Sequence, residues 1–300
     1  MSALRIGTRR SPLALAQAEE IRIRLEVTGV IADIVPMSTS GDEGARADSS
    51  PQGLKGLWID TILDALESGE IDLAVHSAKD LPAEEDEGFT IAAVPEREDP
   101  SDVLICKEPG ELRGGALIGT SSVRRRAQLL AAFPGLEVVD LRGNVETRLR
   151  KLEKGEVDAA VLAAAGLSRL GLAPEHARAL PLAMMVPAPG QGCLAVQARD
   201  DDDDTIAAVA PVDHAASHRA LDAERSLMWR LGGGCALPLG AHATVGMEAV
   251  SLTAVIATAD GTTVLRVETE GATPEDAAAD AAKDLIAQGA ERILAEVETE

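Results

Sequence analysis

Two segments of the chain carry nearly the same pattern of polar and apolar positions. Residues 65–75 and residues 151–161 each run from a helix end, through a glycine, into a short apolar segment. Glycine commonly ends a helix, and an unbroken apolar run after it is typical of a strand buried on both faces of a sheet. A second matched pair, Gly7-Thr8 and Gly119-Thr120, ends an apolar strand and leads into a helix. The repetition predicts two α/β lobes of one plan, with a ligand site in the cleft between them.

The same patterns predict the order of elements in each lobe. In the first lobe we expect a strand at 4–7, a helix that Ser11 caps and Pro12 begins, a strand at 30–37, a helix at 58–66 and a strand at 71–75. The connection 38–53 has no apolar periodicity and has the length of a lid. In the second lobe we expect strands at 102–106, 117–119, 137–141 and 157–162, with helices at 122–132 and after Asn144.

Two polar, proline-containing junctions separate these groups, at residues 96–101 and 187–192. The second leads into another apolar strand, 193–198, so the first lobe is predicted to be discontinuous. The acidic run 200–204 is predicted to be a solvated loop. Beyond it we expect a helix at 213–231, antiparallel strands near 241–245, 250–257 and 263–267, and helices at 274–288 and from 290 onward.

These elements predict an α/β fold of two lobes plus a small α+β third domain. The predicted boundaries are 1–98 with 193–213 for lobe 1, 99–192 for lobe 2 and 214–300 for the third domain.

Composition narrows the class of protein. The net charge is −22 over 300 residues, only six of the 28 basic residues are Lys, and Trp58, Trp229, Phe89 and Phe133 are the only aromatic residues. An acid-rich, Lys-poor surface suits a protein kept soluble in concentrated salt, as in a halophilic prokaryote, and argues against nucleic-acid binding. Without a signal-peptide pattern or an apolar run of membrane-spanning length, we expect a cytoplasmic protein. Three distant cysteines without metal-ligand spacing make a disulfide framework or metal site unexpected.

Polar residues replace apolar ones at one strand end only. The first of the two matched strands ends in His76-Ser77-Ala78-Lys79-Asp80, whereas the second ends in Leu162-Ala163-Ala164-Ala165-Gly166. A carboxylate just past a buried strand can be partly desolvated, which suits Asp80 to proton transfer or to stabilising a developing cation. The alternative is that Asp80 caps the turn before Pro82. A histidine such as His76 is more often a hydrogen-bonded packing residue than a base.

Arginines gather near the predicted helix N-termini of both lobes. Free N–H groups and guanidinium forks together bind carboxylates and phosphates, so the group predicts a site for a ligand with several carboxylates. The alternative is that each arginine pairs with the abundant Asp and Glu at the surface. No Walker-type glycine loop is present, which disfavours a nucleotide. The group comprises Arg9, Arg10, Arg124, Arg125, Arg126, Arg142, Arg148 and Arg169.

One cysteine has an unusual setting. Cys235 follows three consecutive glycines, which leave an uncrowded backbone where a large group could attach to the sulfur. Most free cysteines are small buried apolar residues, and that is the expectation for Cys106 and Cys193.

Five segments of the chain, in order, resemble the porphobilinogen deaminase (hydroxymethylbilane synthase) family. They extend from residue 4 to the region before the C-terminal helices, so the resemblance covers nearly the whole chain. The segments are 4–15 (LRIGTRRSPLAL), 75–82 (VHSAKDLP), 119–125 (GTSSVRR), 141–149 (LRGNVETRL) and 233–235 (GGC).

The resemblance implies a monomeric transferase that joins four porphobilinogen molecules head to tail, with loss of ammonia, and releases linear hydroxymethylbilane. It also implies a dipyrromethane cofactor in thioether linkage to Cys235, two periplasmic-binding-protein-like lobes, and Asp80 as the catalytic residue that stabilises the azafulvene cation. Cofactor-binding positions implied by the family are Lys79, Ser77, Thr120, Ser122, Arg124, Arg125, Arg142 and Gly143. Substrate-binding positions are Arg9, Ser11, Arg148, Arg169, Gln17 and Lys55.

The predicted lid departs from the family pattern. Pro51 stands where bacterial relatives usually carry Lys, Asp60 where a basic residue is usual, and Trp58 where Phe is usual. The alternative function is a two-lobed small-anion-binding module without catalysis, which has no use for the Gly-Gly-Cys segment.

Overall fold

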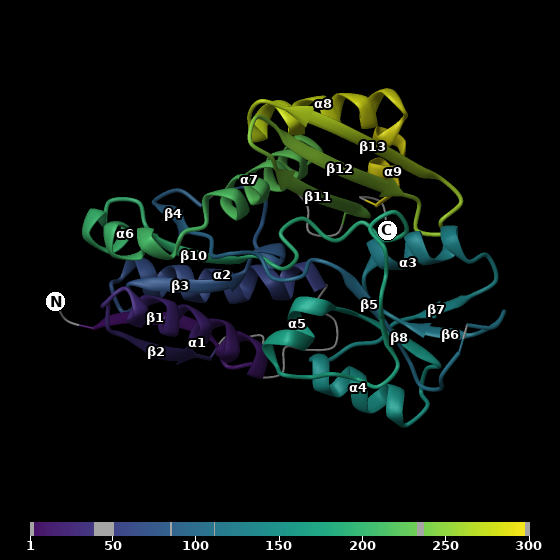
Figure 1. The fold of residues 1–300 in the computed structure, drawn as a ribbon, viewed down its shortest axis with the longest axis horizontal. Coiled ribbons are helices and arrows are strands. Elements are labelled where there is room, and N and C mark those ends of the chain that lie inside the picture. Colours follow the sequence, from purple (N-terminus) through teal and green to yellow (C-terminus); the bar gives the residue numbers. More distant parts are fainter. Residues whose placement is uncertain (1–2, 39–50, 85, 111, 233–236, 298–300) are drawn as a thin grey trace. The chain divides into compact units, whose positions relative to one another are not determined.

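The computed structural model describes residues 3–38, 51–84, 86–110, 112–232 and 237–297, with the side chains of 51–58 and 296–297 left aside. The chain divides into two compact units, one of residues 1–97 with 193–218 and one of residues 98–192 with 219–300 (Figure 1). The residue boundaries of the three predicted domains stay a prediction.

The first unit holds a five-stranded mixed sheet, which we call lobe 1, in the order β2-β1-β3-β10-β4. Strands β1, β2 and β3 are parallel to one another, whereas β10 is antiparallel to both β3 and β4. The elements are β1 (Leu4–Arg9), α1 (Pro12–Val27), β2 (Ala32–Met37), α2 (Pro51–Glu67), β3 (Leu73–Ser77), the 3₁₀ turn η1 (Ala78–Asp80), β4 (Phe89–Ala93), β10 (Leu194–Arg199), α6 (Asp203–Val209) and η2 (Ala210–Val212).

Alternation along β1 and β3 sends side chains to two separate cores. Ile6 and Leu73 pack with Ile21 and Leu25 of α1, whereas Ala74 packs with residues of α2 on the other face. Successive strand residues point to opposite faces, so one helix covers each face of the sheet.

The second unit holds a sheet of the same design, which we call lobe 2, in the order β7-β6-β8-β5-β9. Strands β6, β7 and β8 are parallel, and β5 is antiparallel to β8 and β9. The elements are β5 (Asp102–Cys106), β6 (Leu117–Gly119), α3 (Val123–Ala132), β7 (Glu137–Val139), α4 (Val145–Glu153), β8 (Ala159–Ala163), α5 (Ala164–Arg169) and β9 (Ala177–Ala179).

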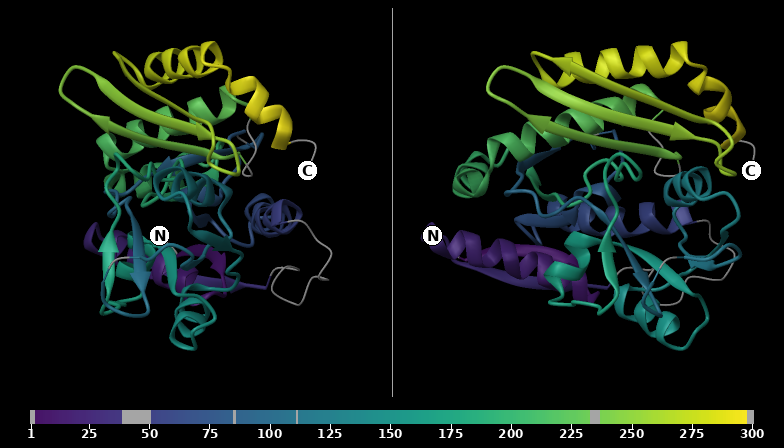
Figure 2. Two further views of the ribbon diagram at one scale, coloured as in Figure 1. Left: turned by 90° about the vertical axis from the view of Figure 1, so that its right-hand side faces the viewer. Right: turned by 45° about the vertical axis from the view of Figure 1, so that its right-hand side comes forward.

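A third, antiparallel sheet lies in the second unit in the order β11-β12-β13, and α8 runs along one face of it (Figure 2). The bounds are α7 (Ala215–Arg230), β11 (Leu239–Val245), β12 (Val250–Ala257), β13 (Val264–Gly271), α8 (Pro274–Ala287) and α9 (Ala290–Val297). The prediction of a mixed α/β chain with two lobes of one plan and a small third sheet is confirmed. None of the described helices is long and apolar enough to cross a membrane.

Three local predictions need correction. Helix α2 begins at Pro51 and not at Trp58, because proline suits the first turn of a helix. The acidic run is not simply a solvated loop, since Asp202 caps α6 by accepting a hydrogen bond from the Thr205 N–H at 3.0 Å. The short elements β4, β9 and α5 were not expected. Most of the predicted lid, residues 39–50, lies outside the described residues.

Candidate active site

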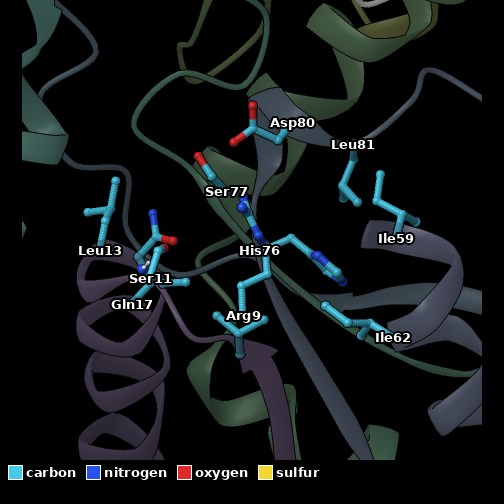
Figure 3. Close-up of a pocket in the computed structure, with 12 residues that line it drawn as sticks. Arg9, Ser11, Leu13, Gln17, Ile59, Ile62, His76, Ser77, Asp80 and Leu81 are labelled. Carbon is cyan, nitrogen blue, oxygen red and sulfur yellow. Dashed lines mark hydrogen bonds between the residues drawn. The ribbon is translucent and has the colours of Figure 1, made fainter. Parts of the chain in front are cut away.

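Lobe 1 contains a pocket of about 90 Å³ at the carboxyl ends of β1 and β3 (Figure 3). The carboxyl edge of parallel strands is where open α/β sheets bind ligands. Five of the site residues named from sequence line this pocket: Arg9, Ser11, Gln17, Ser77 and Asp80. The other lining residues are Leu13, Ala14, Ile59, Ile62, Val75, His76 and Leu81.

The start of α1 brings three of these side chains together. Ser11 is the N-cap, and its Oγ accepts a hydrogen bond from the Ala14 N–H at 3.2 Å. Gln17 lies on the buried face of the helix, one turn and a half further on. In Figure 3 Ser11 and Gln17 extend from α1 toward the side of the pocket that Arg9 of β1 also lines. The N-terminal part of α1 therefore supplies the Ser11 hydroxyl, the Gln17 amide and a positive dipole end beside the Arg9 guanidinium.

Asp80 is held by the turn that ends β3. The Ala78 N–H donates to the Cys193 carbonyl at 3.1 Å and the Leu81 N–H to the Ala78 carbonyl at 3.2 Å, which shapes residues 78–80 into one 3₁₀ turn. Asp80 and Lys79 are both partly exposed, and Asp80 lines the pocket. The carboxylate thus stands at the rim of an otherwise largely apolar pocket, where an interaction with a developing positive charge is stronger than in water.

His76 shares the pocket and was not assigned a site role from the sequence. Burial lowers the pKa of His76 to about 4, with the charge of Asp80 opposing the shift and that of Arg9 adding to it. Its Nε2 is buried and makes no hydrogen bond to any residue that the structure describes. At neutral pH the ring is therefore uncharged. No sequence signal distinguished it from a packing histidine.

In lobe 2 the adjacent arginines of α3 are buried around one carboxylate. The Arg124 Nη1 lies 2.8 Å from Asp102 Oδ2, and the Arg125 Nη2 lies 2.7 Å from Asp102 Oδ1. Burial alone would raise the pKa of Asp102, but the two guanidinium charges hold it well below its usual value. Burial also lowers the pKa of Arg124. The sequence-based alternative of surface ion pairs does not describe this cluster, because all three side chains are buried.

The remaining lobe 2 positions stand at the starts and ends of its helices. Ser122 caps α3, and its N–H donates to Thr120 Oγ1 at 3.2 Å. Arg142 is exposed and lies 3.3 Å from Asp140, just before α4, whose fourth residue is the partly buried Arg148. Gly143 has a φ of 120°, and an added Cβ would meet the Thr147 side chain at 2.7 Å. Arg169 ends α5 and donates to the Gly192 carbonyl at 3.0 Å.

Two positions named from sequence escape description. Cys235 lies outside the described residues, and the side chain of Lys55 does as well. Three polar residues were missed: Asp102, Gln128 and Gln191, all buried in lobe 2. A carboxylate opening an otherwise apolar strand was the one signal that could have identified Asp102.

The donor set of lobe 2 fits a group that carries carboxylates. Two guanidinium groups share one carboxylate there, so the cluster keeps a net positive charge. The Arg124 Nε is buried and forms no hydrogen bond within the part of the chain that the structure describes. A buried cation with donor capacity to spare is compatible with an anionic ligand.

The strand orders and these charged residues define a two-lobed α/β protein with guanidinium groups in both lobes. Residues 4–207 match the family model of the porphobilinogen deaminase, dipyromethane cofactor binding domain, and residues 219–287 match that of the porphobilinogen deaminase C-terminal domain. The chain belongs to the porphobilinogen deaminase family.

Relatives named porphobilinogen deaminase are similar to this chain over nearly its full length. The chain is 45% identical to a porphobilinogen deaminase of Syntrophotalea carbinolica, with 98% of this chain and 96% of the relative covered. It is 44% identical to one of Acidithiobacillus ferrooxidans, with 98% of each chain covered. Among solved structures, a periplasmic substrate-binding protein of Coxiella burnetii is 18% identical, with 74% of this chain and 96% of that chain covered at a TM-score of 0.41.

Proposed function

We propose that this protein is a hydroxymethylbilane synthase, which condenses four porphobilinogen molecules head to tail, releases one ammonia at each step and hydrolyses off the linear product. The observation that carries the proposal is the family match over residues 4–207 and 219–287, with Asp80 at the rim of a pocket that also contains Arg9. Each porphobilinogen carries an acetate and a propionate, and this charge pattern suits arginine-rich sites.

Asp80 is the residue that we assign to the reacting centre. As ammonia leaves the substrate, positive charge develops on the pyrrole and its methylene carbon. A fixed carboxylate in a partly desolvated pocket stabilises that charge more in the transition state than in the ground state. Arg9, Ser11 and Gln17 line the same pocket and are assigned to substrate binding, and Lys79 and Ser77 to cofactor binding.

The dipyrromethane cofactor, when bound, supplies the pyrrole carbon to which the first substrate is joined. We propose that Cys235 holds it by a thioether and that Arg124 and Arg125 bind its carboxylates. Thr120, Ser122, Arg142 and Gly143 complete the proposed cofactor site. Arg148, Arg169 and Lys55 are proposed to bind the substrate units.

Intact mass tests the proposal directly. The purified protein is compared with Cys235→Ser and with Cys106→Ser, which changes a buried cysteine of lobe 2. We expect a two-pyrrole adduct on the native chain and on Cys106→Ser, and none on Cys235→Ser. An unmodified native chain that stays unmodified after incubation with porphobilinogen would contradict the proposal and favour an anion-binding module without catalysis.

We further propose a cytoplasmic monomer adapted to high salt, which does not bind nucleic acid. The net charge of −22 supports this, because self-repulsion opposes association with itself and with polyanions. The screening length falls from about 10 Å at 0.1 M salt to about 3 Å at 1 M, so the repulsion between surface charges is largely removed in concentrated salt. We expect the unfolding temperature in about 1 M KCl to be higher than that in about 0.1 M KCl. The same unfolding temperature at both concentrations would contradict salt adaptation.

A further inference from the structure

Asp102 occupies an unusual position in lobe 2. It is the first residue of β5, its side chain has no exposure, and it faces two arginines of α3. Its Oδ1 accepts from the Arg125 Nε at 2.9 Å and Nη2 at 2.7 Å, and its Oδ2 lies 2.8 Å from the Arg124 Nη1. The guanidinium of Arg125 is fixed further by its Nη1, which donates to the Val161 carbonyl at 3.0 Å.

This arrangement does more than neutralise charge. Burying ions is costly, and apolar residues of similar volume stabilise a fold as well or better. Asp102 offsets only one of two positive charges, so the cluster remains cationic, and the Arg124 Nε has no hydrogen bond among the described residues. The cluster is therefore better suited to presenting a cation in one orientation than to stabilising the fold.

A buried glutamine links the cluster to both ends of the lobe. The Gln191 Nε2 donates to Asp102 Oδ1 at 2.9 Å and to the Pro100 carbonyl at 2.7 Å. Pro100 lies in the segment by which the chain enters lobe 2, and Gln191 in the segment by which it leaves. The two segments are also joined directly, since the Glu98 N–H donates to the Gly192 carbonyl at 3.3 Å.

The segment preceding this exit is attached to Arg124 as well. The Arg124 Nη1 donates to the Val186 carbonyl at 2.6 Å, and Gln128 of α3 bonds both the N–H and the carbonyl of Val186. Residues 186–191 thus contact the cluster at two points, Arg124 through the Val186 carbonyl and Asp102 through the Gln191 amide. Their conformation and the orientation of the guanidinium groups cannot change independently.

We propose that Asp102 is a positioning residue that orients Arg124 and Arg125 for a ligand carboxylate, and that Gln191 couples this orientation to the entering and leaving segments of lobe 2. The proposal rests on the proposed function, in which these arginines bind carboxylates of the cofactor. A change in residues 98–101 or 187–192 then alters the affinity of the arginine pair for a carboxylate.

The test compares Gln191→Met, Asp102→Asn and a control. Gln191→Met keeps the volume and removes the two amide hydrogen bonds, and Asp102→Asn removes the charge at constant size. The control is Asp158→Asn, which changes a lobe 2 carboxylate outside this cluster whose Oδ2 accepts the Leu117 N–H at 2.8 Å. Each variant is measured for unfolding temperature, for the fraction carrying the two-pyrrole adduct by intact mass, and for KM and kcat with porphobilinogen.

We expect Asp102→Asn to lower the adduct fraction about tenfold, and Gln191→Met to raise KM about tenfold while kcat stays within about twofold, tenfold being the effect of one lost interaction of about 1.4 kcal/mol. The control should match the native protein in adduct fraction, KM and kcat. If Asp102→Asn does not fold, Gln191→Met decides the question. Folded Gln191→Met with native KM and native adduct fraction would overturn the proposal.

Failure of the proposed function gives a different result. In that case the native protein itself forms no adduct and does not consume porphobilinogen. The positioning role is then measured by calorimetry with citrate, a small polycarboxylate. Weaker citrate binding by Gln191→Met than by the native protein supports the role, and equal binding overturns it.

Discussion

Lobes 1 and 2 share a scaffold and differ in where they carry charge. In both sheets three parallel strands lie beside an antiparallel strand, β10 in lobe 1 and β5 in lobe 2, which the chain reaches across one of the two junctions. The strand orders match, β2-β1-β3-β10-β4 in lobe 1 and β7-β6-β8-β5-β9 in lobe 2. Matching registers align Gly7 with Gly119, since each precedes a threonine and pairs with an alanine of the next strand. Ser11 and Ser122 cap the equivalent helices.

The polar and ionisable residues occupy different elements of this common scaffold. Lobe 1 carries them at the end of β3 and just beyond, in His76, Ser77 and Asp80, where lobe 2 has Leu162, Ala163 and Gly166. Lobe 2 instead carries a charge on the antiparallel strand. Asp102 pairs with Ala163 in the sheet, whereas the matching residue of lobe 1, Leu194, pairs with Ser77.

The difference separates two kinds of site. In lobe 1 a carboxylate remains partly exposed at a pocket, where it can meet a reacting group. In lobe 2 a carboxylate is fully buried against two arginines, where it can only orient them. Under the proposed function, one scaffold therefore supports a reactive site in lobe 1 and a rigid anion site in lobe 2, according to which strand carries the acid.

The largest expected effect is on turnover, at Asp80. Asp80→Asn keeps the shape of the side chain and removes its charge, so we expect kcat to fall by about 10²–10³-fold, the effect of removing one electrostatic stabiliser. Thermal unfolding should be unchanged, because Asp80 is partly exposed. The matched control is Asp33→Asn, at an exposed position of β2. Near-native turnover by Asp80→Asn would remove the distinction between a reactive and a structural lobe.

The matched glycines test how alike the two scaffolds are. An added Cβ at Gly119 would lie 2.9 Å from Leu141 Cβ and 2.7 Å from its Cδ2, whereas at Gly7 the close contact is Ile71 Cδ1 at 2.2 Å. A terminal methyl can rotate away, but a Cβ cannot. We expect Gly119→Ala to cost about 2–3 kcal/mol in free energy of unfolding and Gly7→Ala about 1 kcal/mol. Denaturant unfolding measures both, and the reverse order would show that Ile71 is the more rigid neighbour.

The repeated strands and their glycine stops were enough to predict the two lobes, because a buried parallel strand leaves an unmistakable apolar run. Strand β9, with only three residues and two of them exposed, leaves no such run. The start of α2 was missed because Gln52 and Gly53 interrupt its apolar pattern.

The sequence pattern drew attention to residues that follow a strand and not to residues inside one, and the roles of both groups stay predictions. Arg9 and Asp80 were named because polar residues break an apolar pattern at a strand end, and Ser77 was named from the family resemblance. All three line one pocket. Asp102 and Gln191 act through partners at least 23 positions away in sequence, on α3 and in the first junction. Local sequence patterns do not contain such pairings.

After the effects expected at Asp80 and at the matched glycines, the next in size is on the pH dependence of stability, through the uncharged His76 of lobe 1. Because the pKa of His76 is lowered from 6.5 to about 4, the unfolded chain binds the extra proton between these pH values. Stability from this group is therefore complete above pH 6.5 and is lost as the pH falls toward 4. His76→Leu introduces the residue type found at the matching position of lobe 2. Between about pH 7 and pH 5 we expect the unfolding free energy of the variant to fall by about 2 kcal/mol less than that of the native protein. Equal losses in the two proteins would mean that His76 is not buried uncharged.

The smallest expected effect is the difference between Asp72 of lobe 1 and Asp158 of lobe 2, two carboxylates at matching positions of the two sheets. Asp72 Oδ2 accepts the Arg5 N–H at 2.8 Å, and Asp158 Oδ2 accepts the Leu117 N–H at 2.8 Å. Only Asp72 adds a two-point pair with a guanidinium, at 3.0 and 2.7 Å to Arg5. This pair, together with the backbone hydrogen bond, lowers the pKa of Asp72 against the effect of burial, which raises it.

Since the Arg5 side chain is 43% exposed, the extra pair is worth little. We expect Asp72→Asn to lower the unfolding free energy by about 1 kcal/mol and Asp158→Asn by about 0.5 kcal/mol. The difference between the variants should shrink in about 1 M KCl, because salt screens the Arg5 pair and leaves the backbone hydrogen bonds intact. If the difference persists in salt, its source is the hydrogen bond from the backbone N–H to the carboxylate and not the Arg5 pair. The two lobes would then differ in the strength of that hydrogen bond.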